Sequence, residues 1–501
     1  MFDLFVQGLH IAITPENFLL MAIGTILGII FSSIPGLTFS TALILLLPMT
    51  FGLSPVAAIS VLLGVFAGGM TGGSIPATLL GIPGNPSAAA TVIDGYMLTK
   101  KGLGGKALGM SIYSSVFGGV VSLIILIAVA PLIAKIALTF GPGELFMLVI
   151  FGLSTIVGLT EGSVIKSIIA CLLGLLMCTV GLDPVMGLQR FTFGFAPLMT
   201  GIGIMPIMIG AFAIPEIINT FLTSKKTKGV IAKRKVEGIK ASFPTWKEQK
   251  QTFRLNMEAS ILGTLVGAVP GAGGPISAFL GYNLAKSRNP KCGTGEIDGV
   301  VGPEAANNGV TGGAMITLLT LGIPADSAAA IILGAFLIHG IVPGPLLFKE
   351  NGGMAYAIFI SMLIINFMVL VIQFFGMKLF IKVLDVPKIN LMAFILSVTI
   401  IGSFAANVNY ADILIMFVMG VLAWFMKRNG FSIIPLILGL VLGGSIEDNF
   451  RKAMVLSGGQ LDIFFNSPVS VIFLILSILM ITSPLIRPFY RKAINLVLKK
   501  A

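Results

Sequence analysis

The sequence predicts an all-α polytopic membrane protein, with about ten to twelve transmembrane segments in two inverted-topology repeats that contain broken or re-entrant helices. Three observations predict this class: the composition, the recurrence of long apolar runs, and a motif that occurs twice. Of the 501 residues, 56% are hydrophobic and 10% are charged, whereas a soluble domain carries about 25% charged residues. Such a chain lacks the polar groups to cover a soluble surface, so its main solvent is lipid.

Apolar runs recur along the whole chain, and they justify the predicted segments in order. A helix needs about 20 apolar residues to cross the hydrocarbon core, and several runs are shorter or stop at Pro-Gly. The runs cover residues 18–34, 55–70, 107–130, 143–161, 163–182, 196–222, 256–269, 354–375, 390–406, 410–426, 430–444 and 468–486. No basic region precedes the first run, so we expect it to be retained as a span rather than cleaved as a signal peptide.

One long polar segment divides the chain near its middle. It holds ten basic residues between Lys225 and Arg254, within a chain whose net charge is +12. We interpret it as a cytoplasmic loop that follows the positive-inside rule, with RNA or anionic-lipid binding as the weaker alternative. The predicted parts are a first repeat half (1–222), this basic cytoplasmic loop (223–255), a second repeat half (256–486) and a basic cytoplasmic tail (487–501).

Short strings recur in the two halves in the same order, at offsets of 235 to 241 residues. Each string alone is weak, because Gly- and Ala-rich strings are common in membrane helices. Several in one order indicate a repeat. The matches are 26–28 with 261–263, 35–36 with 270–271, 71–73 with 311–313, 81–83 with 322–324, and 87–90 with 327–330.

Basic residues predict how the two halves are oriented. The first half carries no Lys or Arg before Lys100, whereas the matching stretch of the second half follows the basic loop and holds three more basic residues. After the repeated strings the bias reverses, from a lysine cluster at 100–106 in the first half to a single Lys349 in the second. Under the positive-inside rule this pattern predicts an inverted repeat, with the N-terminus periplasmic and the C-terminus cytoplasmic.

The strings at 81–90 and 322–330 have the features of broken helices. Each follows a Thr-Gly-Gly string and an apolar stretch too short to span, which a proline ends. The candidate N-caps of the Ala-rich helices that follow are Asn85 or Ser87 in the first copy and Asp326 or Ser327 in the second, with Pro86 at a first helical position. The predicted broken-helix hinges are Pro35, Gly36, Pro83, Pro270, Gly271 and Pro324.

Two such breaks predict a site for an anion. Helix N-termini present unpaired N–H groups and about half a positive charge, and inverted repeats place the substrate where their broken helices meet. The alternative is that the breaks are kinks that only let helices pack closely. The predicted substrate-binding residues are Thr71, Gly72, Gly73, Asn85, Pro86, Ser87, Asn307, Asn308, Thr311, Gly312, Asp326 and Ser327. Nearby carboxylates, among them Glu304 and Asp94, are candidates for coordinating Na⁺ or relaying a proton.

The chain offers no pattern typical of an enzyme or a metal site. Its three cysteines form no CxxC pair, its two histidines are too few for a His-based site, and it has no Walker A motif. We therefore expect no enzyme activity, no metal and no cofactor apart from a coupling Na⁺ or H⁺. We also expect no nucleic-acid partner.

With these residues identified, the chain resembles the large membrane subunit of the tripartite tricarboxylate transporter family. The matching strings are 81–96, 190–194, 303–308, 320–324, 339–348 and 439–443. The resemblance implies a multi-pass carrier in the bacterial inner membrane. It also implies two protein partners, a small membrane subunit and a periplasmic substrate-binding protein. The implied substrates are organic anions such as citrate, other di- and tricarboxylates and some aromatic acids.

The predicted function is uptake of a carboxylate by symport with Na⁺ or H⁺, as a secondary active transporter that works by alternating access. Two alternatives belong to other classes. The first is a passive organic-anion channel, which saturable, gradient-dependent uptake that requires a binding protein would exclude. An intramembrane lipid-modifying enzyme needs clustered carboxylates or histidines with cationic residues at depth, and the sequence offers few.

Overall fold

A computed structural model describes residues 2–159, 163–183, 185–224, 240–383 and 388–482. The described residues are mostly helical, and their one sheet is a two-stranded hairpin. The predicted all-helical class is therefore confirmed. Residues 225–239 of the basic loop predicted at 223–255, and all of the predicted tail, lie outside the described residues.

The chain folds into two compact units, and each unit takes one segment from each predicted half. Unit 1 comprises residues 1–137 and 216–406, and unit 2 comprises 138–215 and 407–501. The helices of unit 1 are α1 (Phe2–Ala12), α2 (Pro15–Ser33), α3 (Phe39–Leu46), α4 (Pro55–Gly72), α5 (Ser74–Leu80), α6 (Ala89–Lys100), α7 (Gly104–Ala137), α11 (Trp246–Gly267), α12 (Gly273–Arg288), α13 (Asp298–Leu321), α14 (Ser327–Ile338), α15 (Pro345–Glu350), α16 (Gly352–Val383) and α17 (Lys388–Asn407), with short 3₁₀ turns η1 (Pro48–Thr50) and η2 (Pro86–Ala88).

Unit 2 is smaller and contains the hairpin. Its elements are α8 (Pro142–Leu159), α9 (Val164–Cys178), β1 (Gly181–Leu182), β2 (Gln189–Arg190), η3 (Ala196–Leu198), α18 (Tyr410–Arg428), α19 (Ile434–Leu456) and η4 (Leu461–Phe464). Helix α10 (Ile204–Ser224) belongs to unit 2 in its first part and to unit 1 in its second. A further apolar helix covers Pro468–Thr482.

Six helices of the described residues are long and apolar enough to cross a membrane. They are Pro15–Ser33, Pro55–Leu80, Gly104–Ala137, Ile204–Leu222, Gly352–Val383 and Tyr410–Arg428. Six shorter apolar helices of 10–17 residues accompany them. A multi-pass membrane protein follows from these lengths and compositions. The span count of about ten to twelve stays a prediction.

Helix starts follow ordinary capping chemistry. Thr14 accepts a hydrogen bond from the backbone N–H of Asn17 at 3.3 Å, and Pro15 occupies the first turn of α2. Thr245 and Glu248 form a reciprocal capping box at the start of α11. These polar starts fix where helices begin in a chain whose hydrophobic pattern is nearly continuous.

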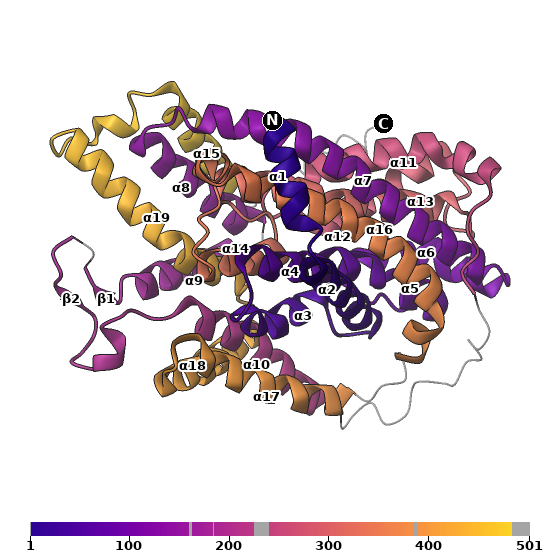
Figure 1. The fold of residues 1–501 in the computed structure, drawn as a ribbon, viewed down its shortest axis with the longest axis horizontal. Helices are drawn as coiled ribbons and strands as arrows, with labels where there is room; N and C mark the ends of the chain where they lie inside the picture. The colour runs from indigo at the N-terminus through magenta and orange to yellow at the C-terminus, as the bar shows by residue number, and fades with distance from the viewer. Residues whose placement is uncertain (1, 160–162, 184, 225–239, 384–387, 483–501) are drawn as a thin grey trace, which may run out of the picture. The chain divides into compact units, whose positions relative to one another are not determined.

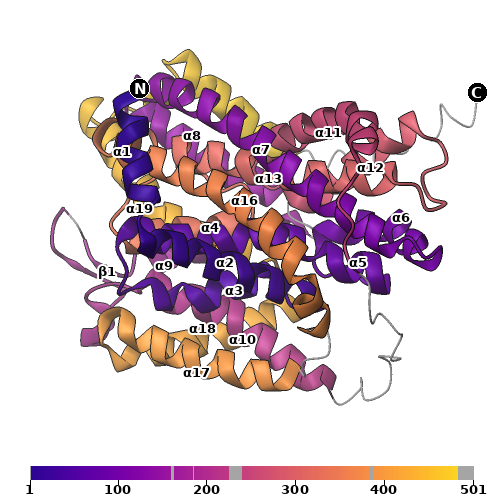
Figure 2. The ribbon, with the colours of Figure 1, turned by 45° about the vertical axis from the view of Figure 1, so that its right-hand side comes forward.

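The centre of unit 1 is built on glycine contacts between helix pairs, and the same contacts occur twice. A methyl group on Gly28 of α2 would lie 2.3 Å from the carbonyl oxygen of Val65 in α4. One on Gly263 of α11 would lie 2.1 Å from the carbonyl oxygen of Ala306 in α13. The pairs α2–α4 and α11–α13 thus pack backbone to backbone at matching positions (Figures 1 and 2). This parallel adds support to the predicted repeat, whose inverted topology stays a prediction.

The second copy differs from the first in one detail of its helices. The apolar stretch before its break is the last part of α13, which runs without interruption from Asp298 to Leu321. In the first copy, by contrast, the single residue Gly73 separates α4 from α5 within the apolar helix Pro55–Leu80. The two copies of this stretch differ in length by one residue, because the repeat offset rises from 240 at the Thr-Gly-Gly string to 241 at Gly-Ile-Pro.

A proline accounts for this difference between the copies. Pro76 lies in the first turn of α5, where it is tolerated because the first N–H groups of a helix have no intrahelical acceptor. At the two repeat offsets, Pro76 corresponds to Ile316 or Thr317 of α13. Both of these residues keep the backbone N–H group that proline lacks, so α13 continues through this point.

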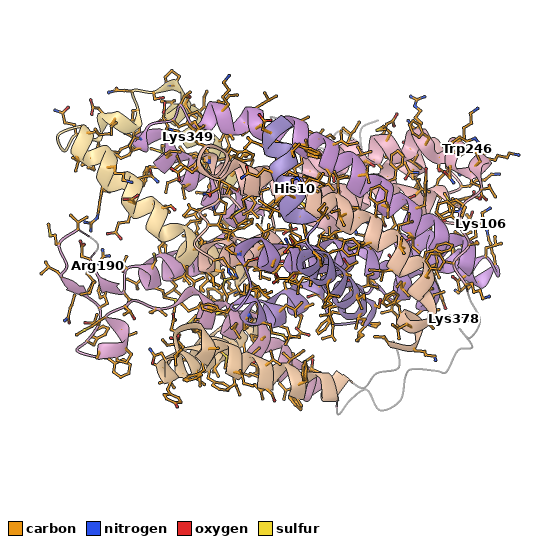
Figure 3. The ribbon with its side chains drawn as sticks, in the orientation of Figure 1. His10, Lys106, Arg190, Trp246, Lys349 and Lys378 are labelled. Carbon is orange, nitrogen blue, oxygen red and sulfur yellow. The ribbon has the colours of Figure 1, made fainter. Side chains whose placement is uncertain are left out.

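Contacts within unit 1 gather the predicted cytoplasmic loops at one end. The Lys101 ammonium donates to the carbonyl oxygen of Gly295 at 3.3 Å. The backbone N–H of Ser242 donates to the carbonyl oxygen of Gly105 at 2.9 Å. In Figure 3, Lys106 and Trp246 lie toward this end and Lys349 lies away from it. Loops that the charge pattern assigns to one side of the membrane therefore meet one another.

The loops predicted to be periplasmic also meet. Thr50 and His339 are joined by a hydrogen bond of 3.1 Å between the threonine hydroxyl and the ring Nε2. Helix α1 packs against α16, where a methyl group on Gly8 would lie 2.7 Å from the backbone nitrogen of Ala357. The two sets of loops are thus grouped as the charge pattern predicts, although the side of the membrane on which each lies stays a prediction.

Candidate functional site

A buried asparagine caps the turn that follows the first break. Gly81 ends α5 in a left-handed conformation (φ +72°), which glycine adopts without strain. Four residues later, Asn85 accepts a hydrogen bond from the backbone N–H of Ala88 at 2.9 Å. Its amide also donates to the hydroxyl of Ser32 at 2.8 Å and to the carbonyl oxygen of Gly69 at 3.0 Å. Asn85 therefore caps the turn that leads into α6 and ties it to α2 and α4.

The second break has the same local geometry. Gly322 ends α13 with φ +70°, and Asp326 accepts from the backbone N–H of Ala329 at 2.8 Å. Of the alternative N-caps, the structure uses Asn85 and Asp326 rather than the serines that follow. Pro86 occupies the first turn of η2, as its fixed φ favours.

A third helix start lies beside these two breaks. The backbone N–H of Gly271 donates to the carbonyl oxygen of Ala325 at 2.6 Å, which joins the start of α12 to the second break. A methyl group on Gly274 would lie 2.3 Å from the hydroxyl oxygen of Ser87. One on Gly273 would lie 3.9 Å from Cβ of Asp326. The starts of α12 and α14 and the turn before α6 therefore meet.

All six predicted hinge residues lie between helices. Gly36 and Gly271 have matching left-handed conformations, with φ +87° and +84°. Whether these positions move during transport stays a prediction.

Helices α4 and α13 cross beside the helix starts, and polar side chains join them. The Asn307 amide donates to the carbonyl oxygen of Met70 at 3.0 Å, and the Thr71 hydroxyl donates to Oδ1 of Asn308 at 3.0 Å. Thr311 donates to the carbonyl oxygen of Asn308 at 2.7 Å. Oδ1 of Asn307 is buried and has no hydrogen-bond partner among the described residues. Oδ1 of Asn307 is therefore an acceptor without a donor in the described part of the chain, and it lies with the Ser87 hydroxyl next to Gly274.

The predicted glycines have packing roles at this crossing. Gly72 lies against the backbone of Ile29, and Gly73 lies against the Asn85 amide. Gly312 packs on Ser122 of α7, where a methyl group would lie 2.6 Å from the backbone. Ser327 is half-buried at the start of α14. The structure thus brings together Ser87, Asn307, Asn308, Thr71 and Asp326, while the three glycines let the helices approach.

A buried carboxylate lies one turn away along α13, with partners that the sequence did not indicate. Glu304 is 1% exposed. Its Oε1 accepts from the Thr91 hydroxyl at 2.5 Å, and its Oε2 accepts from the Ser115 hydroxyl at 2.9 Å. Thr91 and Ser115 lie 213 and 189 residues from Glu304 in the chain. No local pattern signals contacts over such separations.

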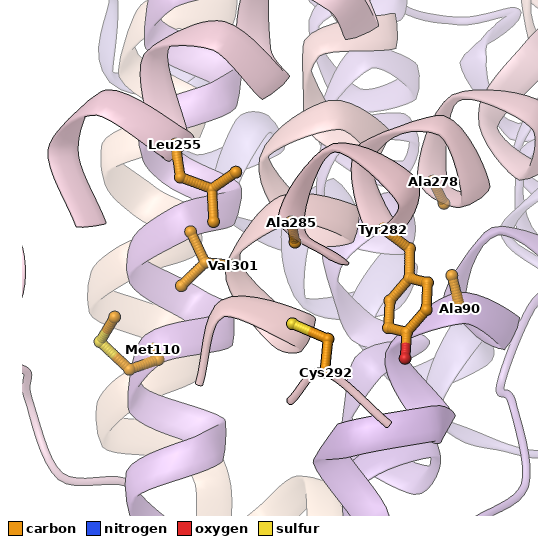
Figure 4. Close-up of a cluster of buried hydrophobic side chains, with 8 residues drawn as sticks. All are labelled: Ala90, Met110, Leu255, Ala278, Tyr282, Ala285, Cys292 and Val301. Carbon is orange, nitrogen blue, oxygen red and sulfur yellow. The ribbon is translucent and has the colours of Figure 1, made fainter. Parts of the chain in front are cut away.

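Asp94 has a structural role. Its carboxylate accepts hydrogen bonds from the backbone N–H groups of Gly293, Gly295 and Glu296 at 2.7–2.9 Å, and from the Tyr282 hydroxyl at 3.1 Å. Figure 4 shows Tyr282 beside Ala90 in a buried apolar cluster. Asp94 thereby ties α6 to the loop between α12 and α13.

Sequence similarity decides the family of the chain. The model of the tripartite tricarboxylate transporter TctA family matches residues 18–438. The chain belongs to this family. A 52.8 kDa protein from the TAR-I ttuC′ 3′ region of Agrobacterium vitis is 35% identical over 469 residues, which cover 92% of each chain. A protein from the TAR-II ttuC′ 3′ region of the same organism is 37% identical over 211 residues, covering 42% of this chain and 87% of its own. No solved structure matches significantly.

Unit 2 of this TctA-family chain holds a second polar cluster. Arg190 donates to Glu447 at 2.7 Å, and Arg451 donates to Asp183 at 2.6 Å. The backbone N–H of Met186 and the Arg451 guanidinium hold the pKa of Asp183 below its usual range. Arg190, Glu447 and Arg451 border an open cavity of about 1240 Å³. The arginines already pair with Glu447 and Asp183, so an additional anion would compete with these acids for them.

Proposed function

We propose that this TctA-family chain is the translocating subunit of a secondary active transporter that imports a di- or tricarboxylate, or a related organic anion, across the bacterial inner membrane. It works with a coupling Na⁺ or H⁺ gradient, a small membrane subunit and a periplasmic binding protein. Family membership supports the coarser role of a tricarboxylate transporter subunit. The finer role rests on the site described above.

The observation that carries the proposal is the meeting of helix starts beside the α4–α13 crossing. Helix starts direct N–H groups and positive dipole ends toward a carboxylate, and the Ser87 hydroxyl supplies a further donor. Ser87 and Asn307 are buried. An anion therefore reaches them only when the surrounding helices separate, which is the movement that alternating access requires.

Transport in proteoliposomes tests the proposal. The chain and its small membrane partner are reconstituted with unlabelled citrate inside, and entry of labelled citrate, another tricarboxylate or a dicarboxylate is followed in the absence of an ion gradient. Saturable counterflow of at least one carboxylate is expected. A passive channel gives equilibration without counterflow, and an enzyme gives an altered product without transport, so either result contradicts the proposal.

The orientation is proposed separately, with the N-terminus periplasmic and the C-terminus cytoplasmic. The grouping of loops within unit 1 supports it, because Lys101 and Ser242 belong to the predicted cytoplasmic set and Thr50 and His339 to the opposite set. A reporter at residue 52 is expected outside, and one in the 223–255 loop inside. The reverse result contradicts the orientation without affecting the transport proposal.

A further inference from the structure

Glu304 is a buried acid without a basic partner among the described residues. It is 1% exposed, and its carboxylate oxygens accept hydrogen bonds from the hydroxyls of Thr91 and Ser115. A buried carboxylate normally requires a paired cation or several donors, because removing its charge from water is costly. In membrane helices, such residues mark ion or proton pathways.

The position of Glu304 links it to the proposed anion site. The Asn308 amide donates to the carbonyl oxygen of Glu304 at 3.0 Å, which places the acid one helical turn from the α4–α13 crossing. In the segment that packs against α13, Thr91 follows Ser87 by four residues, which is about one helical turn. Glu304–Thr91 and Asn307–Ser87 are therefore neighbouring layers between α13 and the segment 86–100.

The described helices packed on α13 bring no opposite charge to Glu304. Several titratable groups on these helices have partners of their own, namely Asp94 with Tyr282, Lys106 with Glu248, and Glu258 with Arg254 and Arg288. Helix α7 approaches closely here, because a methyl group on Gly118 would lie 2.2 Å from the carbonyl oxygen of Ala305. That close approach holds Ser115 against the acid.

We infer that Glu304 binds the coupling cation, a proton or a sodium ion, of the transport cycle proposed above. A proton adds to one carboxylate oxygen, and a sodium ion is bound by the carboxylate with the two hydroxyl oxygens. Hydroxyls suit both, since each has one donor and two acceptor lone pairs and reorients without backbone movement. Neutralising Glu304 removes a negative charge one turn from the anion site, so cation and carboxylate bind together. This inference rests on the proposed function.

Glu304→Gln tests the inference, because glutamine has nearly the same shape as glutamate but a neutral side chain. Its amide neither takes up a proton nor carries the negative charge that attracts sodium. Counterflow without a gradient and accumulation driven by a pH gradient or a sodium gradient are measured in the same proteoliposomes. The variant is expected to lose accumulation about tenfold or more under the gradient that drives the wild type, and its counterflow is expected to lose the dependence on pH or sodium that the wild type shows. That gradient identifies the cation. Glu258→Gln, on the exposed side of α11, is the matched control and should behave as wild type.

The outcomes separate the two proposals. Gradient-driven accumulation that survives in Glu304→Gln overturns the cation site while leaving the transporter in place. Absence of wild-type counterflow overturns the proposed function and this inference with it. If the variant does not reach the membrane, Thr91→Val replaces it, and we expect a shifted pH or sodium dependence of uptake. An unchanged dependence overturns the inference.

Discussion

The Thr71 hydroxyl donates a 3.0 Å hydrogen bond to Oδ1 of Asn308 and so joins α4 to α13 across 237 residues of sequence. Both residues are buried. Removing the donor leaves a buried acceptor unsatisfied, so Thr71→Val is expected to destabilise the protein by about 1–3 kcal/mol. Thermal unfolding in detergent measures the change. Thr78→Val is the control, because the Thr78 hydroxyl is buried without a partner among the described residues. Equal effects of the two variants contradict the role of the bond.

The glycine contacts predict a matched effect in the two helix pairs. Gly28→Ala and Gly263→Ala each force a methyl group to within 2.3 Å of a backbone carbonyl oxygen, and each is expected to cost about 1–3 kcal/mol. Gly444→Ala in α19 meets nothing within 4 Å and should be neutral or stabilising. Thermal unfolding measures all three. A neutral result at either Gly28 or Gly263 contradicts the close packing.

Asp326 places a carboxylate beside the proposed anion site. Asp326→Asn keeps an oxygen that can cap Ala329 and removes the negative charge. We therefore expect a lower KM for the carboxylate with the helix intact. Initial rates of uptake over a range of substrate concentrations measure it, with Asp412→Asn in unit 2 as the control. A raised KM for Asp326→Asn would show that the carboxylate serves binding rather than opposing it.

The second polar cluster, in unit 2, predicts that the stability of the protein depends on pH. Because the folded-state pKa of Asp183 is below its ordinary value of 3.8, its contribution to stability is complete above that value and is lost as the pH falls through the lower folded pKa. The stability difference between wild type and Asp183→Asn should be constant from neutral pH to about 4 and should shrink below it. Thermal unfolding against pH tests this. A difference that shrinks already between about pH 7 and 5 contradicts it.

Much of the local structure could be predicted from the sequence. Prolines and glycines marked the breaks, and capping residues marked the helix starts, because these effects depend on neighbouring residues. The choice between Asn85 and Ser87 could not be made, since it depends on Ser32 and Gly69 reaching the Asn85 amide.

The site itself depends on long-range packing. The contact of Asn307 with the Met70 carbonyl oxygen, and those of Glu304 with Thr91 and Ser115, arise only when distant helices cross. A backbone carbonyl carries no sequence signal, and serine and threonine are common in membrane helices. These contacts therefore had no pattern by which they could be found.

Counterflow by tryptophan variants tests the central claim most directly. Ser87→Trp and Ser327→Trp place a bulky ring at the meeting of the helix starts, whereas Ser397→Trp places it on an exposed face of α17. All three are assayed at equal amounts of membrane-inserted protein. We predict that Ser87→Trp and Ser327→Trp abolish carboxylate counterflow and that Ser397→Trp retains it. Normal counterflow by both Ser87→Trp and Ser327→Trp would contradict the claim that the anion binds where these helices begin.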